Sequence, residues 1–108
     1  CLLSLADYLI DCVYPDFGEK FRNTFTDEKG AYSHIKQYGG EEFIIDETGL
    51  KRCEIPNRGD IVLIKLKRNV AGLFLGDEIA FRTNRGVIEI SSKFVEISHC
   101  WSVEKCQP

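Results

Sequence analysis

Methionine is absent from all 108 residues, so the sequence has no initiator residue and begins at Cys1. We expect a truncated or processed chain, because Cys1 leads directly into a helical pattern with no linker. A lipidated N-terminus and an N-terminal cysteine nucleophile are the alternatives.

Long apolar runs and a basic face are also missing. No run approaches the ~20 residues that a membrane helix requires. The net charge is −3, whereas phosphate neutralisation needs clustered basic residues. We therefore expect neither a membrane nor a nucleic-acid partner, and we expect Lys65, Lys67 and Arg68 to be solvated at a hairpin tip.

The cysteines lack the spacing of a metal site. There are five, at positions 1, 12, 53, 100 and 106, with no Cys-x-x-Cys pair. The odd number and the spacing argue against a zinc knuckle and a disulfide framework, and they predict free thiols in a reducing compartment. Phosphate-binding loops, paired carboxylates and metal-ligand spacings are absent as well, so we expect no cofactor and no metal.

The segment that organises the sequence is residues 58–82. Two six-residue apolar runs, 61–66 and 70–75, flank a charged break at 67–69, and Gly76-Asp77 separates them from a third run at 78–81. Short runs of this kind are typical of buried strands, and the breaks suit turns. The pattern predicts three consecutive antiparallel strands at the centre of a sheet.

The remaining sequence predicts helices first and strands afterwards. Apolar positions in residues 1–13 follow a helical period over a wide face. Thr26 is a candidate N-cap for a second helix that ends at Gly39-Gly40. Residues 43–45 fit either a short strand or a helical turn, and further strands are expected at 87–90 and 94–103. We predict one α+β domain over residues 1–108, with N-terminal helices packed on a C-terminal antiparallel sheet of about five strands.

Three residues are candidates for catalysis. Cys1 stands at the start of a helix, where backbone N–H groups and the helix dipole stabilise a thiolate. His34 and His99 could each act as a general base. The alternative is structural: Cys1 as a chain end, His34 on a polar helix face, and His99 as a packed or surface residue.

The order of these motifs resembles the NlpC-type papain-like cysteine peptidases, which are cell-wall hydrolases also found in phage tails. In that family a cysteine opens the first helix, Gly-Asp starts a strand, and the next strand reads roughly His-Val-Gly-Ile-Tyr-Leu-Gly. The matching segments here are residues 1–8 (CLLSLADY), 58–63 (RGDIVL) and 71–76 (AGLFLG). The resemblance implies a reduced papain-like, NlpC-like fold.

A small phage- and prophage-encoded branch of unknown function is similar over nearly the whole sequence. The shared features are an aromatic-basic segment (Phe21-Arg22), a helix ending in Gly-Gly (residues 32–40) and a terminal tryptophan strand (Cys100-Trp101). This similarity implies a virion component, located in the tail or in the bacterial cytoplasm during assembly.

One departure from the family concerns the catalytic histidine, which falls on Ala71. Alanine accepts no proton, and residues 80–82 offer no side chain to orient an imidazole. We therefore expect a non-enzymatic structural or assembly component of a phage or prophage tail, whose partners are other virion proteins. The alternative is an active cysteine peptidase or amidase that cleaves peptidoglycan peptides, with Cys1 as nucleophile and His99 as a substitute base.

Overall fold

The computed structural model describes residues 2–12, 14–16, 18–19, 28–83 and 85–104, and of these it gives only the backbone of residues 3, 28, 29, 31, 32 and 34. Thr26 and the Phe21-Arg22 segment lie outside the described residues. The described elements are α1 (Leu2–Asp11), α2 (Glu28–Gln37), α3 (Glu41–Asp46), β1 (Lys51–Cys53), β2 (Ile61–Lys65), β3 (Asn69–Phe74), β4 (Glu78–Thr83), β5 (Gly86–Ser91), the 3-10 helix η2 (Ser92–Phe94) and β6 (Glu96–Ser102).

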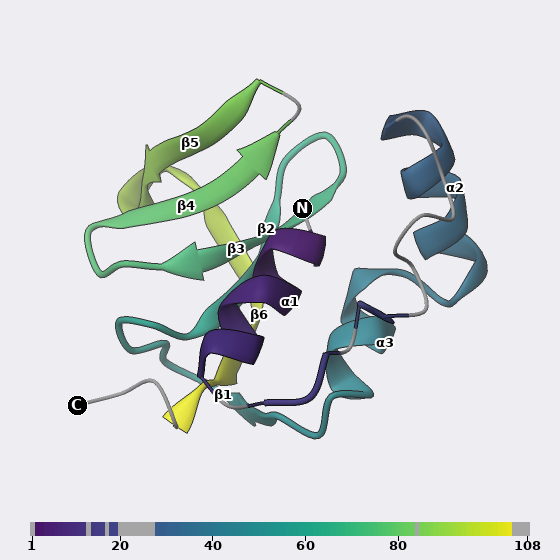
Figure 1. Cartoon of the computed structure of the whole chain (residues 1–108). Helices are drawn as coiled ribbons and strands as arrows, with labels where there is room; N and C mark the ends of the chain where they lie inside the picture. Colours follow the sequence, from purple (N-terminus) through teal and green to yellow (C-terminus); the bar gives the residue numbers. More distant parts are fainter. Residues whose placement is uncertain (1, 13, 17, 20–27, 84, 105–108) are drawn as a thin grey trace.

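The strands form one antiparallel sheet in the order β1-β6-β2-β3-β4-β5 (Figure 1). The predicted α+β class is confirmed, as is the hairpin of β2 and β3, in which Leu63 lies opposite Ala71. The segment at 43–45 is helical, within α3. The expectation of about five strands was one too few, because β1 is only three residues long and pairs with β6 from the far end of the sequence.

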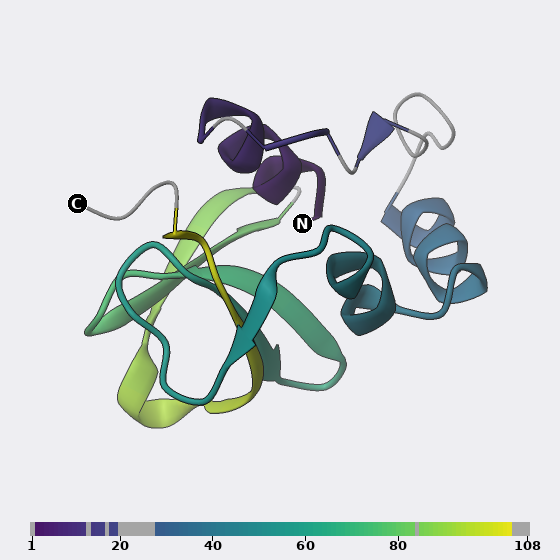
Figure 2. The ribbon, with the colours of Figure 1, turned by 90° about the horizontal axis from the view of Figure 1, so that it is seen from below.

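Each face of the sheet has its own apolar cluster. On one face, α1 and α3 pack against β2, β3 and β6, and Figure 2 shows α1 lying across this face. On the other face, residues from all six strands meet around Val62, Ile64, Ile79 and Cys100. Because both edge strands reach this second cluster, through Cys53 on β1 and Ile90 on β5, the sheet curls around it.

The turn at Gly59-Asp60 links strands β2 and β3 to α1. Gly59 has φ of 99°, a left-handed conformation that favours glycine. Its N–H donates to the carbonyl of Phe74 at 2.8 Å, and its carbonyl accepts the Tyr8 hydroxyl at 2.7 Å. The turn therefore fixes the start of β2 against both the end of β3 and the helix.

The side chain of Asp60 is fully buried, with 0% exposure. Its Oδ1 accepts the N–H of Val103 at 3.0 Å, and its Oδ2 accepts the N–H of Asn57 at 2.7 Å. Buried backbone donors need such partners, since an unpaired one is costly. One carboxyl group thus satisfies donors from the β1–β2 connection and from the end of β6.

The cysteines differ from the sequence-based expectation. Cys12 is disulfide-bonded, whereas Cys53 and Cys100 are free thiols. Cys1 and Cys106 lie outside the described residues. The prediction of five free thiols is wrong at Cys12, because an odd count excludes complete pairing but leaves room for a single bond.

We predict that Asp60→Ala lowers the free energy of unfolding by about 3 kcal/mol, since the buried N–H of Val103 and the part-buried N–H of Asn57 lose their acceptor. Denaturant titration followed by the fluorescence of Trp101, the single tryptophan, measures the change. The matched control is Asp77→Ala, which removes an exposed carboxyl and should stay within about 0.5 kcal/mol of the parent chain. Equal effects of the two variants would contradict this role for Asp60.

Candidate functional site

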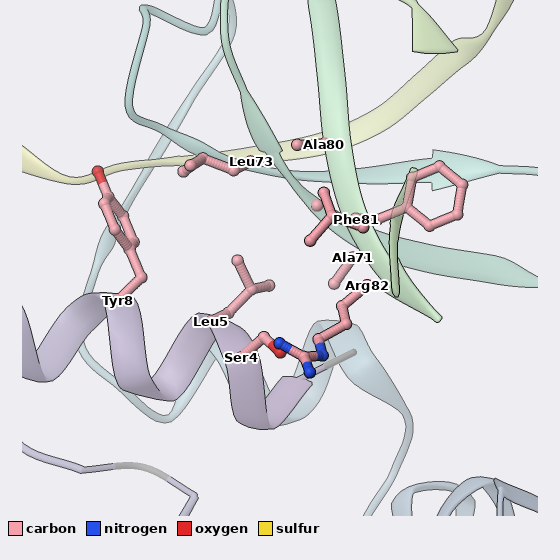
Figure 3. A pocket seen from close by; sticks show the side chains of 10 residues that line it. Ser4, Leu5, Tyr8, Ala71, Leu73, Ala80, Phe81 and Arg82 are labelled. Carbon is pink, nitrogen blue, oxygen red and sulfur yellow. The ribbon is translucent and has the colours of Figure 1, made fainter. Parts of the chain in front are cut away.

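A pocket of about 230 Å³ lies between α1 and strands β3, β4 and β5 (Figure 3). It occupies the side of the sheet that α1 covers. Its wall is formed by Ser4, Leu5, Tyr8, Ala71, Gly72, Leu73, Ala80, Phe81, Arg82 and Val87.

Small residues on the strands create this space. Ala71 and Ala80 leave only methyl groups in the wall. A Cβ at Gly72 would lie 2.9 Å from the carbonyl oxygen of Ala80 and 2.9 Å from Cγ2 of Ile79, so β3 and β4 pass each other closely there. From the opposite side, α1 contributes Ser4 and Tyr8, which lie four residues apart on one helix face.

The polar groups of the pocket wall do not form an acid–base pair. Figure 3 shows Ser4, Tyr8 and Arg82 around an interior of apolar side chains. The Tyr8 hydroxyl donates to the Gly59 carbonyl, and burial raises the pKa of this phenol, with smaller contributions from Asp60 and Tyr14. Arginine is a donor only. The pocket therefore suits an apolar group better than a proton transfer.

Ala71, the position of the expected catalytic histidine, is 4% exposed and lies on the pocket wall. Cys1 lies outside the described residues, so the predicted approach of its sulfur to Ala71 stays a prediction. The side chain of His34, on α2, also lies outside the described part.

His99 lies in the same row of the sheet as Ala71 but two strands away. Leu63 pairs with Ala71 on one side and with His99 on the other. Directly opposed residues point to the same face, and two strand spacings separate the outer pair by roughly 10 Å. A general base must be within hydrogen-bond reach of its proton, so His99 does not take the place of a histidine at position 71.

Both ring nitrogens of His99 have partners within the protein. Nε2 lies 2.8 Å from Oε1 of Glu42 on α3, and Nδ1 lies 3.0 Å from Oγ of Ser98. The Ser98 hydroxyl is also 3.1 Å from the carbonyl oxygen of Leu63, to which it donates. The register between β2 and β6 shifts between Leu63 and Ile64, opposite Ser98 and His99. Such a bulge lets the side chains of these two successive residues approach each other.

A charged cluster beside His99 connects α3, β1 and β6. Arg52 donates to Asp46 and, at 3.0 Å, to Oε2 of Glu42, while its guanidinium lies 5.6 Å from the centre of the Trp101 ring. The indole of Trp101 donates to Oδ1 of Asp46 at 2.8 Å. Sequence reasoning missed this cluster, because its members are far apart along the chain; only the acids of α3, four residues apart, give a local signal.

No group of three or more histidine, cysteine or acidic side chains in the described part of the chain is arranged to hold a metal ion. No helix in the same part is long and apolar enough to cross a membrane.

We predict that Asp46→Asn destabilises the protein at pH 7 and that the difference narrows below about pH 4. The hydrogen bonds from Arg52 hold the pKa of Asp46 below its usual 3.8, so this carboxylate stabilises the folded state above that pH and loses the effect as pH falls through the lowered pKa. The side chain is 39% exposed, so solvent screens the pair and we expect about 0.5–1 kcal/mol.

Denaturant titrations at pH 7, 5 and 3 measure this difference. Asparagine keeps an oxygen that can accept from Trp101, so the variant isolates the interaction with Arg52. Glu104→Gln, at an exposed position, is the control and should behave as the parent chain at each pH. A difference between Asp46→Asn and the parent chain that is constant with pH would argue against the Arg52 interaction as its source.

Comparisons with family models, with curated proteins and with solved structures find no match to this chain.

Proposed function

We propose that this chain is a non-enzymatic structural or assembly component of a phage or prophage tail, built on the scaffold of an NlpC-type cysteine hydrolase. The observation that carries the proposal is Ala71: where the resembled family places its catalytic histidine, this chain has a buried methyl group on a pocket wall.

The order of the elements supports the choice of scaffold. A buried helix comes first, a Gly-Asp turn starts β2, and the hairpin strand β3 ends close to the sequence Leu-Gly. The pocket lies between that helix and strand β3, with β4 beside it, which is where the resemblance would place a reacting thiol and its base.

The side chains around the pocket argue against turnover. General-base help is typically worth ~10²–10⁴ in rate, and in the part of the chain that the structure describes the wall holds no histidine or carboxylate. The hydroxyl of Tyr8 is already donated to Gly59. An apolar pocket without a base can still seat an apolar side chain of a neighbouring virion protein, and this is the use that the proposal assigns to it.

The alternative is an active cysteine peptidase with Cys1 as nucleophile and His99 as base. The contact of His99 with Glu42 favours it, because a carboxylate that orients an imidazole is a common arrangement in such enzymes. The other ring nitrogen, however, lies against Ser98. We prefer the structural function for this reason and because of Ala71.

We predict that the purified full chain does not cleave muropeptides at neutral pH, and that Ala71→His does not confer cleavage, since no side chain in the pocket wall would orient the new ring. Product analysis by liquid chromatography measures turnover, with an active hydrolase of the resembled family as positive control. Cleavage that disappears in Cys1→Ser would establish the peptidase instead. If it also disappeared in His99→Ala, the base would be His99.

We predict that the protein is present in purified virions and that Cys1→Ser leaves particle yield and infectivity unchanged. Mass spectrometry of the particles and plaque counts measure these outcomes. Genes for tape-measure and tail-tip proteins beside its own gene would agree with the proposal. Absence of the protein from purified particles would refute the tail assignment, whatever the result of the muropeptide assay.

A further inference from the structure

Two free thiols face each other at the edge of the sheet. Cys53 on β1 is the direct partner of Cys100 on β6, and 47 residues separate them along the chain. Their sulfur atoms lie 2.8 Å apart. Cys100 is 3% exposed, whereas Cys53 is partly exposed and reachable from solvent.

The backbone at this pair fits a disulfide without rearrangement. Directly opposed residues of antiparallel strands have Cα atoms about 4.5–5.5 Å apart, within the range of about 4.4–6.8 Å that disulfides span. The two sulfurs need to approach by less than about 1 Å to reach bonding distance. Rotation of the side chains provides such a movement, so the strands can keep their register.

We propose that Cys53 and Cys100 are a disulfide-forming site that links β1 to β6 when the folded protein meets a small disulfide oxidant such as oxidised glutathione. A thiolate of one cysteine attacks a sulfur of the oxidant, forms a mixed disulfide and releases one glutathione thiolate. The second cysteine then attacks the mixed disulfide and releases the second glutathione. The two thiol protons pass to the released glutathione, so two cysteines are oxidised and one oxidant is reduced.

The surroundings of Cys53 make the reduced pair persistent at neutral pH. Burial raises the pKa of Cys53 to about 12, with contributions from Cys100 and from Asp60, whose Oδ2 lies 3.8 Å from the sulfur. Because the thiolate is the attacking species, its fraction at Cys53 rises about a hundredfold between pH 7 and pH 9. Closure of the bond should therefore be slow at pH 7 and faster at pH 9.

The bond would secure β1, the shortest of the described strands. Among the described strands, β1 pairs with β6 alone and is three residues long. The same strand carries Arg52, which contacts α3 through Asp46 and Glu42. A disulfide that closes a loop of this length restricts the unfolded chain, and we expect the melting temperature to rise by about 10 °C.

Peptide mapping tests the proposal on the full chain. The protein is incubated with oxidised glutathione at pH 7 and pH 9, blocked with an alkylating agent, and digested with trypsin without reduction. Cleavage after Arg52, Arg58, Lys93 and Lys105 places Cys53 in residues 53–58 and Cys100 in residues 94–105, apart from the other three cysteines. We expect these two peptides to be joined, with faster joining at pH 9 and separation by dithiothreitol.

Cys53→Ala is the matched variant for the thermal measurement. Oxidation should raise the melting temperature of the parent chain but not that of the variant, so any effect of the Cys12 disulfide is common to both and cancels. Persistent glutathione adducts on Cys53 or Cys100 without the joined peptides would overturn the proposal. So would joining of either peptide to one that contains Cys1, Cys12 or Cys106. Should the variant fail to fold, the parent chain's peptide map still decides.

Discussion

The carboxyl group of Asp60 is the constraint on which the arrangement of the other elements depends. It is fully buried, and it accepts backbone N–H groups from Asn57 and from Val103, which stand on opposite sides of it in the sequence. The backbone of Asp60 also accepts the N–H of Phe74. The same turn receives the hydroxyl of Tyr8 from α1. Through one turn, the helix, the hairpin and the last strand acquire fixed positions around the pocket.

The elements that could be predicted are those whose signal is local. The β2–β3 hairpin follows from two apolar runs around a charged break, and the antiparallel pairing of these runs is confirmed. β1 was missed because three residues carry too little pattern to be recognised as a strand. The position of β6 between β1 and β2 depends on contacts between residues that are far apart in the sequence. It follows from the burial of Trp101 and Cys100 on opposite faces of the sheet, which only the folded chain reveals.

The residues of the candidate site likewise differ in whether their positions could be predicted from the sequence. That Ala71 lies on the strand paired with β2 could be predicted, because the two apolar runs are adjacent in the sequence. The partners of His99 could not, since Glu42 lies on a helix in the first half of the chain. Asp46 and Trp101 are 55 residues apart, and no periodicity relates them. Contacts of this kind arise from the packing of α3 on the sheet, where apolar residues such as Ile44 and Ile45 determine which acids face β6.

The lack of a histidine or carboxylate among the described residues of the pocket wall involves more than one position. Ala71 supplies a methyl group, and on the neighbouring strand Ala80 and Arg82 also line the wall. Alanine has no side-chain acceptor, and the guanidinium of arginine only donates, so neither could hold a protonated ring nitrogen of an imidazole at position 71. A catalytic pair needs both the base and the group that orients it. The described residues of the pocket wall offer neither, and most of them are apolar.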